Sequence, residues 1–93
     1  MKKVILKGHG LSEYDMYTKK GSNWFAMMSD MKNWCRQTFG KGYNTVNRKW
    51  GWRSGVTVGL EFDEFDEFEQ EVHYPVFYFA EESHATLFLI RWS

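Results

Sequence analysis

Apolar side chains alternate with polar ones through most of the second half of the chain. On either side of an acidic stretch they recur at every second residue: Val56, Val58, Leu60 and Phe62, then Val72, Tyr74, Val76 and Tyr78. A period of two places such side chains on one face of a β-strand. The pattern therefore predicts strands over 55–62 and 68–79 and, because a short segment joins them, an antiparallel sheet.

The acidic stretch between these strands, residues 61–69, is three copies of the triplet Glu-Phe-acid. A hairpin centred on Phe65 would match apolar with apolar on one core face in three of its four cross-strand pairs: Phe62–Phe68, Leu60–Gln70, Val58–Val72 and Val56–Tyr74. The alternative is a short acidic helix over 61–70, in which the three Phe of the triplets share one side. We favour the hairpin, which leaves Phe65 at its tip without a structural role.

Residues 22–39 carry the clearest helical pattern. Apolar or small side chains recur there at a spacing of three to four: Trp24, Phe25, Met28, Met31, Trp34, Cys35 and Thr38. Ser22 or Asn23 is suited to cap the start of the helix, and Gly40 to end it. This face is expected to pack on the sheet, so the single Cys35 is predicted to be a core residue rather than a nucleophile.

The two ends of the chain supply the remaining elements. Residues 2–7 predict a first strand, and the spacing of Ser12 and Asp15 predicts a short helix over 12–19 that is closed by Gly21. Residues 82–91 fit a helix or a buried strand. We favour the helix, because acidic residues stand in its first turn and Arg91 stands in its last.

The passage from Val76 to Leu89 reads as a strand, a short acidic turn and a helix that carries Ala85 and Phe88. It resembles the passage from the third strand to the second helix of ferredoxin-like or RRM-type βαββαβ domains. The resemblance implies the layered arrangement of those domains. It implies no function, because residues 74–79 lack the basic residue and the Gly of the RRM signature. We therefore predict one α+β domain over residues 1–93, with an antiparallel sheet packed on the main helix and a C-terminal helix.

Charge is divided between the two halves of the chain, although the net charge is zero. Residues 1–55 hold 11 Lys and Arg and three acids, whereas residues 56–93 hold nine acids and one Arg. This division predicts a dipolar surface, unless the halves interleave in the fold and their charges pair.

The acidic triplets motivate the first functional hypothesis. A row of carboxylates around an apolar anchor is typical of a protein-binding surface, and it can imitate a phosphate backbone. We expect a non-enzymatic interaction or inhibitor protein that binds a host protein with a basic surface. The predicted partner-binding residues are Glu64, Phe65, Asp66 and Glu67.

The alternative hypothesis is a nucleic-acid-binding module that uses the segment 41–53. Its cations could neutralise phosphates and its aromatic rings could stack on unpaired bases. The residues concerned are Lys41, Tyr43, Arg48, Lys49, Trp50, Trp52 and Arg53. The competing interpretation is that the Trp residues only anchor this loop to the core.

No pattern in the sequence names a reaction, so no catalytic residue and no cofactor is predicted. The three His are far apart, and a hydrolase or nuclease using His9 with Glu13 or Asp15 remains the weaker alternative. The acids at 63–66 lack the spacing and the Gly of a calcium-binding loop, so no metal is expected.

The single Cys and the short apolar run at the N-terminus favour a cytoplasmic protein without a signal peptide or membrane span. The short, aromatic-rich chain is typical of phage-encoded proteins, for which the compartment would be the host cytoplasm. The exposed strand edges and abundant Trp are also compatible with a homodimer.

Overall fold

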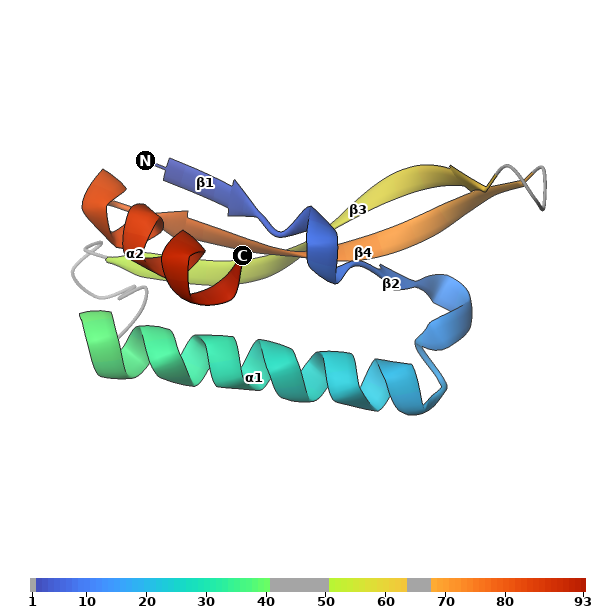
Figure 1. Cartoon of the computed structure of the whole chain (residues 1–93), viewed down its shortest axis with the longest axis horizontal. Helices are drawn as coiled ribbons and strands as arrows, with labels where there is room; N and C mark the ends of the chain where they lie inside the picture. Colours follow the sequence, from blue (N-terminus) through green and yellow to red (C-terminus); the bar gives the residue numbers. More distant parts are fainter. Residues whose placement is uncertain (1, 41–50, 64–67) are drawn as a thin grey trace, which may run out of the picture.

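The computed structural model of the chain describes residues 2–40, 51–63 and 68–93. The elements along the chain are β1 (Lys2–Ile5), the 3-10 turn η1 (Lys7–His9), β2 (Leu11–Ser12), the 3-10 turn η2 (Glu13–Asp15), α1 (Lys19–Phe39), β3 (Trp52–Asp63), β4 (Phe68–Phe79) and α2 (Glu82–Trp92). Two helices cover one face of a four-stranded antiparallel sheet (Figure 1). The predicted α+β class and the C-terminal helix are therefore confirmed.

The central strand of the sheet is β4. It pairs with β3 along one side, and with β1 and then β2 along the other. The chain passes from β1 through α1 to β3, and β4 lies between these two strands. This is a split β-α-β arrangement, so the layers implied by the resemblance of residues 76–89 are present.

The core lies between the sheet and the two helices. Its fully buried aromatic centre is Phe77 and Phe79 from β4 with Phe88 from α2, whose ring centroid lies 4.4 Å from that of Phe77. The core residues of α1 are Trp24, Met28, Met31 and Cys35, as its helical pattern predicted. Phe25 was expected in this face but is 55% exposed.

The start of α1 differs from the prediction. The helix begins at Lys19, and Thr18 caps it by accepting a hydrogen bond from the backbone N–H of Lys20 at 3.2 Å. The predicted helix over 12–19 is wrong, since Ser12 ends β2, the turn η2 follows it, and α1 begins only at Lys19. Gly21 lies inside the helix rather than after one, and a Cβ at this position would overlap the carbonyl oxygen of Met16. Where α1 ends, the prediction holds: Gly40 follows it with φ of +87°.

The strands β3 and β4 form the expected hairpin. Strand pairs run from Trp52 opposite Phe79 to Asp63 opposite Phe68, so the alternative of a helix over 61–70 is wrong for the described residues. The register differs from the predicted one by a single residue: Val58 lies opposite His73 instead of Val72.

Trp52 explains this register. In the observed pairing Trp52 shares the helix-covered face with Phe79, and both are buried. In the predicted pairing Trp52 would lie opposite Tyr78 and would leave the core. A shift of one residue exchanges the two faces of a strand, so burying the largest side chain of β3 sets its register.

Candidate functional site

The distal half of the hairpin extends beyond α2, and its tip also extends past the start of α1 (Figure 1). We call this part, residues 56–63 of β3 and 68–75 of β4, the arm. No residue of the arm belongs to the cluster of buried side chains that joins the sheet to the helices. The molecule measures 47 × 27 × 24 Å, and the arm accounts for one end of its long axis.

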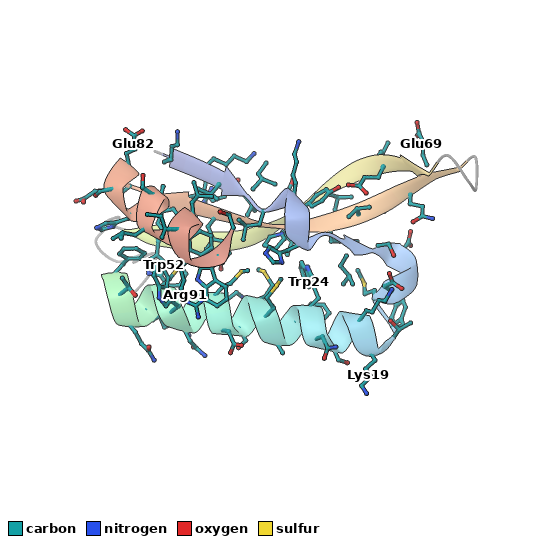
Figure 2. All side chains as sticks on the ribbon, viewed as in Figure 1. Lys19, Trp24, Trp52, Glu69, Glu82 and Arg91 are labelled. Carbon is teal, nitrogen blue, oxygen red and sulfur yellow. The ribbon has the colours of Figure 1, made fainter. Side chains whose placement is uncertain are left out.

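The described part of the arm is acidic. The side chains of Glu61, Glu69 and Glu71 are exposed, and the sequence holds no Lys or Arg from residue 54 to residue 90. Figure 2 shows Glu69 projecting from the arm near its tip. The predicted partner-binding residues Glu64, Phe65, Asp66 and Glu67 lie outside the described residues. The structure therefore places the residues next to them on a projecting acidic element.

Three aliphatic side chains of the arm face solvent. Val56 is 48% exposed, Val58 is 52% exposed and Leu60 is 65% exposed. These residues were expected to join the core. They share the helix-side face with Trp52, but they lie in the distal half of the hairpin and outside the buried cluster. We call these three residues the aliphatic row.

The opposite face of the arm is closed by Tyr74. This ring is 6% exposed and lies close to two glycines, since a Cβ at Gly59 would be 3.1 Å from it and a Cβ at Gly10 would be 2.7 Å from it. The Tyr74 hydroxyl donates a hydrogen bond to Glu61. This hydrogen bond, with desolvation of the ring, raises the pKa of Tyr74 to about 12. Glu61 is thereby held on this face, whereas Glu69 and Glu71 belong to the face of the aliphatic row.

The alternative nucleic-acid site is only partly described. Of its predicted residues, Lys41, Tyr43, Arg48, Lys49 and Trp50 lie outside the described residues. Trp52 is 4% exposed, and its indole N–H donates a 2.9 Å hydrogen bond to the carbonyl oxygen of Gly40. The structure contradicts a base-stacking role for Trp52, because its ring is enclosed in the core.

Arg53 lies on the sheet face away from the helices. Its guanidinium carbon is 4.5 Å from the centre of the Tyr78 ring, and the Lys3 ammonium is 5.9 Å from the same centre. Sequence reasoning missed Lys3 and Tyr78 in this group. The strand register brings this group together, since Lys3 on β1 and Arg53 on β3 both lie opposite Tyr78 on β4.

The residues of the weaker enzyme hypothesis are partly brought together. His9 and Asp15 line a hollow of about 400 Å³ between η1, η2 and α1, whereas Glu13 does not line it. Both groups already have structural contacts. His9 Nε2 lies 3.0 Å from the carbonyl oxygen of Trp92, and Asp15 accepts a 3.0 Å hydrogen bond from the hydroxyl of Ser12.

Cys35 is fully buried, as predicted, and desolvation raises the pKa of its thiol to about 12. A thiol with so high a pKa is a poor nucleophile at neutral pH. Among the described residues, no group of three His, Cys, Asp or Glu side chains is placed to hold a metal ion. The described helices include none that is long and apolar enough to cross a membrane.

Comparison of the chain with protein-family models, with curated proteins and with solved structures finds no match.

Proposed function

We propose that this protein is a non-enzymatic interaction protein whose acidic arm binds a basic surface of a partner protein. One observation carries the proposal: the described arm exposes acids on a projecting hairpin, and the sequence places no Lys or Arg there to pair with them. Residues 1–55 are mostly basic, so the acidic arm forms the opposite pole of the charge division along the chain.

The physical argument is electrostatic complementarity. Carboxylates on neighbouring strands repel one another in the free protein, and a basic partner relieves this repulsion while it steers the encounter. Glu69 and Glu71 flank the aliphatic row on the same face, which supplies apolar contact inside a charged rim. A row of carboxylates also resembles a phosphate backbone in its charge. The partner we propose is therefore a host protein with a basic, nucleic-acid-binding site in the cytoplasm, which the arm would occupy and inhibit.

The test compares two charge reversals. Glu69→Lys with Glu71→Lys changes the arm, and Glu81→Lys with Glu82→Lys makes the same change of net charge at the start of α2. Figure 2 shows Glu69 and Glu82 at opposite ends of the molecule. Proteins captured from a host extract by the immobilised wild-type chain would be purified, and their affinity for each variant measured by calorimetry at two salt concentrations.

We expect the arm variant to bind at least about tenfold more weakly, and the control to bind within about twofold of the wild type. The affinity of the wild type should fall as salt rises. Equal affinity of the arm variant and the wild type for every purified partner would overturn the proposal.

A nucleic-acid-binding module is the second candidate, and the cluster of Arg53, Lys3 and Tyr78 favours it. Cations beside an aromatic ring on an uncovered sheet face are suited to bind the backbone and bases of a single strand. Fluorescence titration with single- and double-stranded DNA and RNA would test it. Binding that weakens with salt and is lost in Arg53→Ala, or in Arg48→Ala with Lys49→Ala, would support this candidate. The matched control is Lys19→Ala, at the start of α1 (Figure 2).

A further inference from the structure

Among residues 2–40, 51–63 and 68–93, no strand pairs with the outer edge of β3. Within the described residues, β3 pairs only with β4, and it is 12 residues long. Proteins commonly protect such edges with Lys, Pro, a bulge or a very short strand. From Ser54 to Leu60 the strand has no charge and no Pro, and its pairing with β4 is continuous. The middle of this edge is therefore free to accept another strand.

The backbone groups of the aliphatic row point toward this open edge. The carbonyl of Pro75 accepts a hydrogen bond from the N–H of Leu6, so Pro75 directs its polar backbone group away from β3. Val56 lies opposite Pro75, and in an antiparallel pair the backbone groups of such partners both point outward. The direction alternates along a strand, so the amides of Val56, Val58 and Leu60 all face the open edge. These residues offer both unpaired hydrogen-bonding groups and exposed apolar side chains.

The strand is complementary to itself. If a second copy of β3 lies antiparallel with a two-fold axis at Val58, then Val58 meets its own counterpart and Val56 meets Leu60. The aliphatic rows of the two copies then lie on one face of the joined sheet. The same pairing places Arg53 opposite Asp63 of the other copy, so opposite charges stand at both ends. A symmetric dimer requires this kind of self-complementary surface.

Neighbouring axis positions fit less well. An axis at Thr57 would place Leu60 opposite Ser54, which breaks the apolar match. An axis at Gly59 would move Arg53 past Asp63, the last residue of β3, and would remove its acidic partner. Of these three axes, the one at Val58 pairs apolar residues with apolar residues and also pairs Arg53 with an acidic residue.

We propose that the protein forms a symmetric dimer in which the β3 strands of two copies pair antiparallel about Val58 and join their four-stranded sheets into one. The partner that fits this edge is a second copy of the same chain. This inference does not depend on the proposed function. Glu69 and Glu71 belong to β4, one strand away from the new pairing, so they stay exposed in the dimer.

The dimer can be tested with the full chain by sedimentation equilibrium over a range of concentrations. Val58→Glu places two like charges opposite each other at the axis, and we expect it to raise the dissociation constant at least about a hundredfold. Ile90→Glu is the matched control. It places the same charge at an apolar side chain of α2 that is 76% exposed, and it should leave the dimer unchanged.

A cross-linking experiment tests the position of the axis. Val58→Cys brings two thiols together across the axis, so mild oxidation should give a covalent dimer. Val56→Cys faces Leu60 of the other copy and should give little. Cys35 does not interfere, because it is fully buried.

A chain that stays monomeric at all concentrations would overturn the proposal. A dimer unaffected by Val58→Glu, or one that Val56→Cys cross-links as well as Val58→Cys does, would also overturn it. If Val58→Glu failed to fold, the cross-linking comparison would still decide. None of these results depends on whether a partner protein binds the arm.

Discussion

At the scale of the residue, Trp52 shows how one side chain separates a structural from a functional interpretation. In the sequence it stands among Lys, Arg and other aromatic residues, a pattern typical of a nucleic-acid-binding loop. In the structure its ring is buried and its N–H is paired. Composition alone could not make this distinction, because burial depends on the register that Trp52 itself sets.

The burial of Trp52 predicts a large cost on truncation. We expect Trp52→Ala to lower the free energy of unfolding by about 3–5 kcal/mol, because it removes a buried ring and leaves a cavity. Leu87→Ala, at a side chain 48% exposed on α2, should change it by no more than about 0.5 kcal/mol. Urea denaturation measures both. A cost below about 1 kcal/mol for Trp52→Ala would show that the ring is not a core residue.

Tyr74 gives a prediction with a defined pH window. Its pKa is raised from an ordinary value of 10.0 to about 12 by the hydrogen bond to Glu61 and by desolvation. The folded protein thus favours the protonated phenol. The stabilisation it provides is fully present below pH 10.0 and is lost as the pH rises through about 12.

The measurement is the free energy of unfolding against pH for the wild type, Tyr74→Phe and Glu61→Gln. Wild type should lose stability relative to Tyr74→Phe within this alkaline window. Glu61→Gln should show a smaller decline that ends at lower pH, because without the Glu61 carboxylate the pKa of Tyr74 in the folded protein lies closer to its ordinary value. Parallel profiles for all three proteins would contradict the hydrogen bond between Tyr74 and Glu61.

At the scale of the element, periodicity identified the type of each long segment and failed at the boundaries. The helical face of α1 and the alternation of β3 and β4 each extend over many residues, so a few exceptions do not hide them. The start of α1 depends instead on Thr18 and on a close contact between Gly21 and Met16. Such a contact joins backbone atoms and leaves no periodic trace in the sequence.

The register of the hairpin was beyond sequence reasoning for a related reason. The predicted pairing matches apolar residues across the strands, whereas the observed pairing places Val58 opposite His73 and Leu60 opposite Glu71. The burial of Trp52 against the helices favours the observed pairing, and the sequence does not show where the helices lie. The exposed aliphatic row followed from the observed register and could not be found without it. The acidic character of the arm, by contrast, was visible in the sequence because charge does not depend on register.

Gly21 provides the test of the corrected helix start. In an exposed helix interior, Gly→Ala usually stabilises by about 0.4–1 kcal/mol. Here we expect Gly21→Ala to destabilise by about 1–3 kcal/mol, because its Cβ would overlap the Met16 carbonyl. Ser29→Ala, at an exposed site in the same helix, should be neutral or slightly stabilising. Thermal unfolding of both variants measures the difference. A more stable Gly21→Ala would mean that the two segments do not meet.

At the scale of the whole molecule, the structure separates a stabilising half from a projecting half. The buried cluster takes its members from β1, α1, α2 and the proximal parts of β3 and β4, together with Leu6 and Leu11. The arm contributes none of them, yet it carries four of the 12 acidic residues of the chain and the aliphatic row. An exposed surface that is apolar, or that carries charges of one sign, is typical of a binding element when it contributes little to the core.

This division predicts that the arm can be removed. Gly59 lies opposite Val72, so joining these two residues through Asn-Gly would close a shorter hairpin with a favourable two-residue turn. We expect the shortened protein to fold and to lose no more than about 2 kcal/mol of unfolding free energy, because the buried cluster is kept. About 1 kcal/mol of this decrease in unfolding free energy comes from losing the hydrogen bond between Tyr74 and Glu61.

The control for this deletion is Phe77→Ala, which removes a fully buried ring and should cost about 3–5 kcal/mol. Circular dichroism and urea denaturation compare the two proteins. The shortened chain should also be monomeric, because it lacks Leu60, which would lie opposite Val56 of the other copy. It should not bind a partner protein through the arm, because it lacks Glu69 and Glu71. If it were unfolded while Phe77→Ala remained folded, the arm would be part of what holds the fold together, and its exposed residues would need no function to explain them.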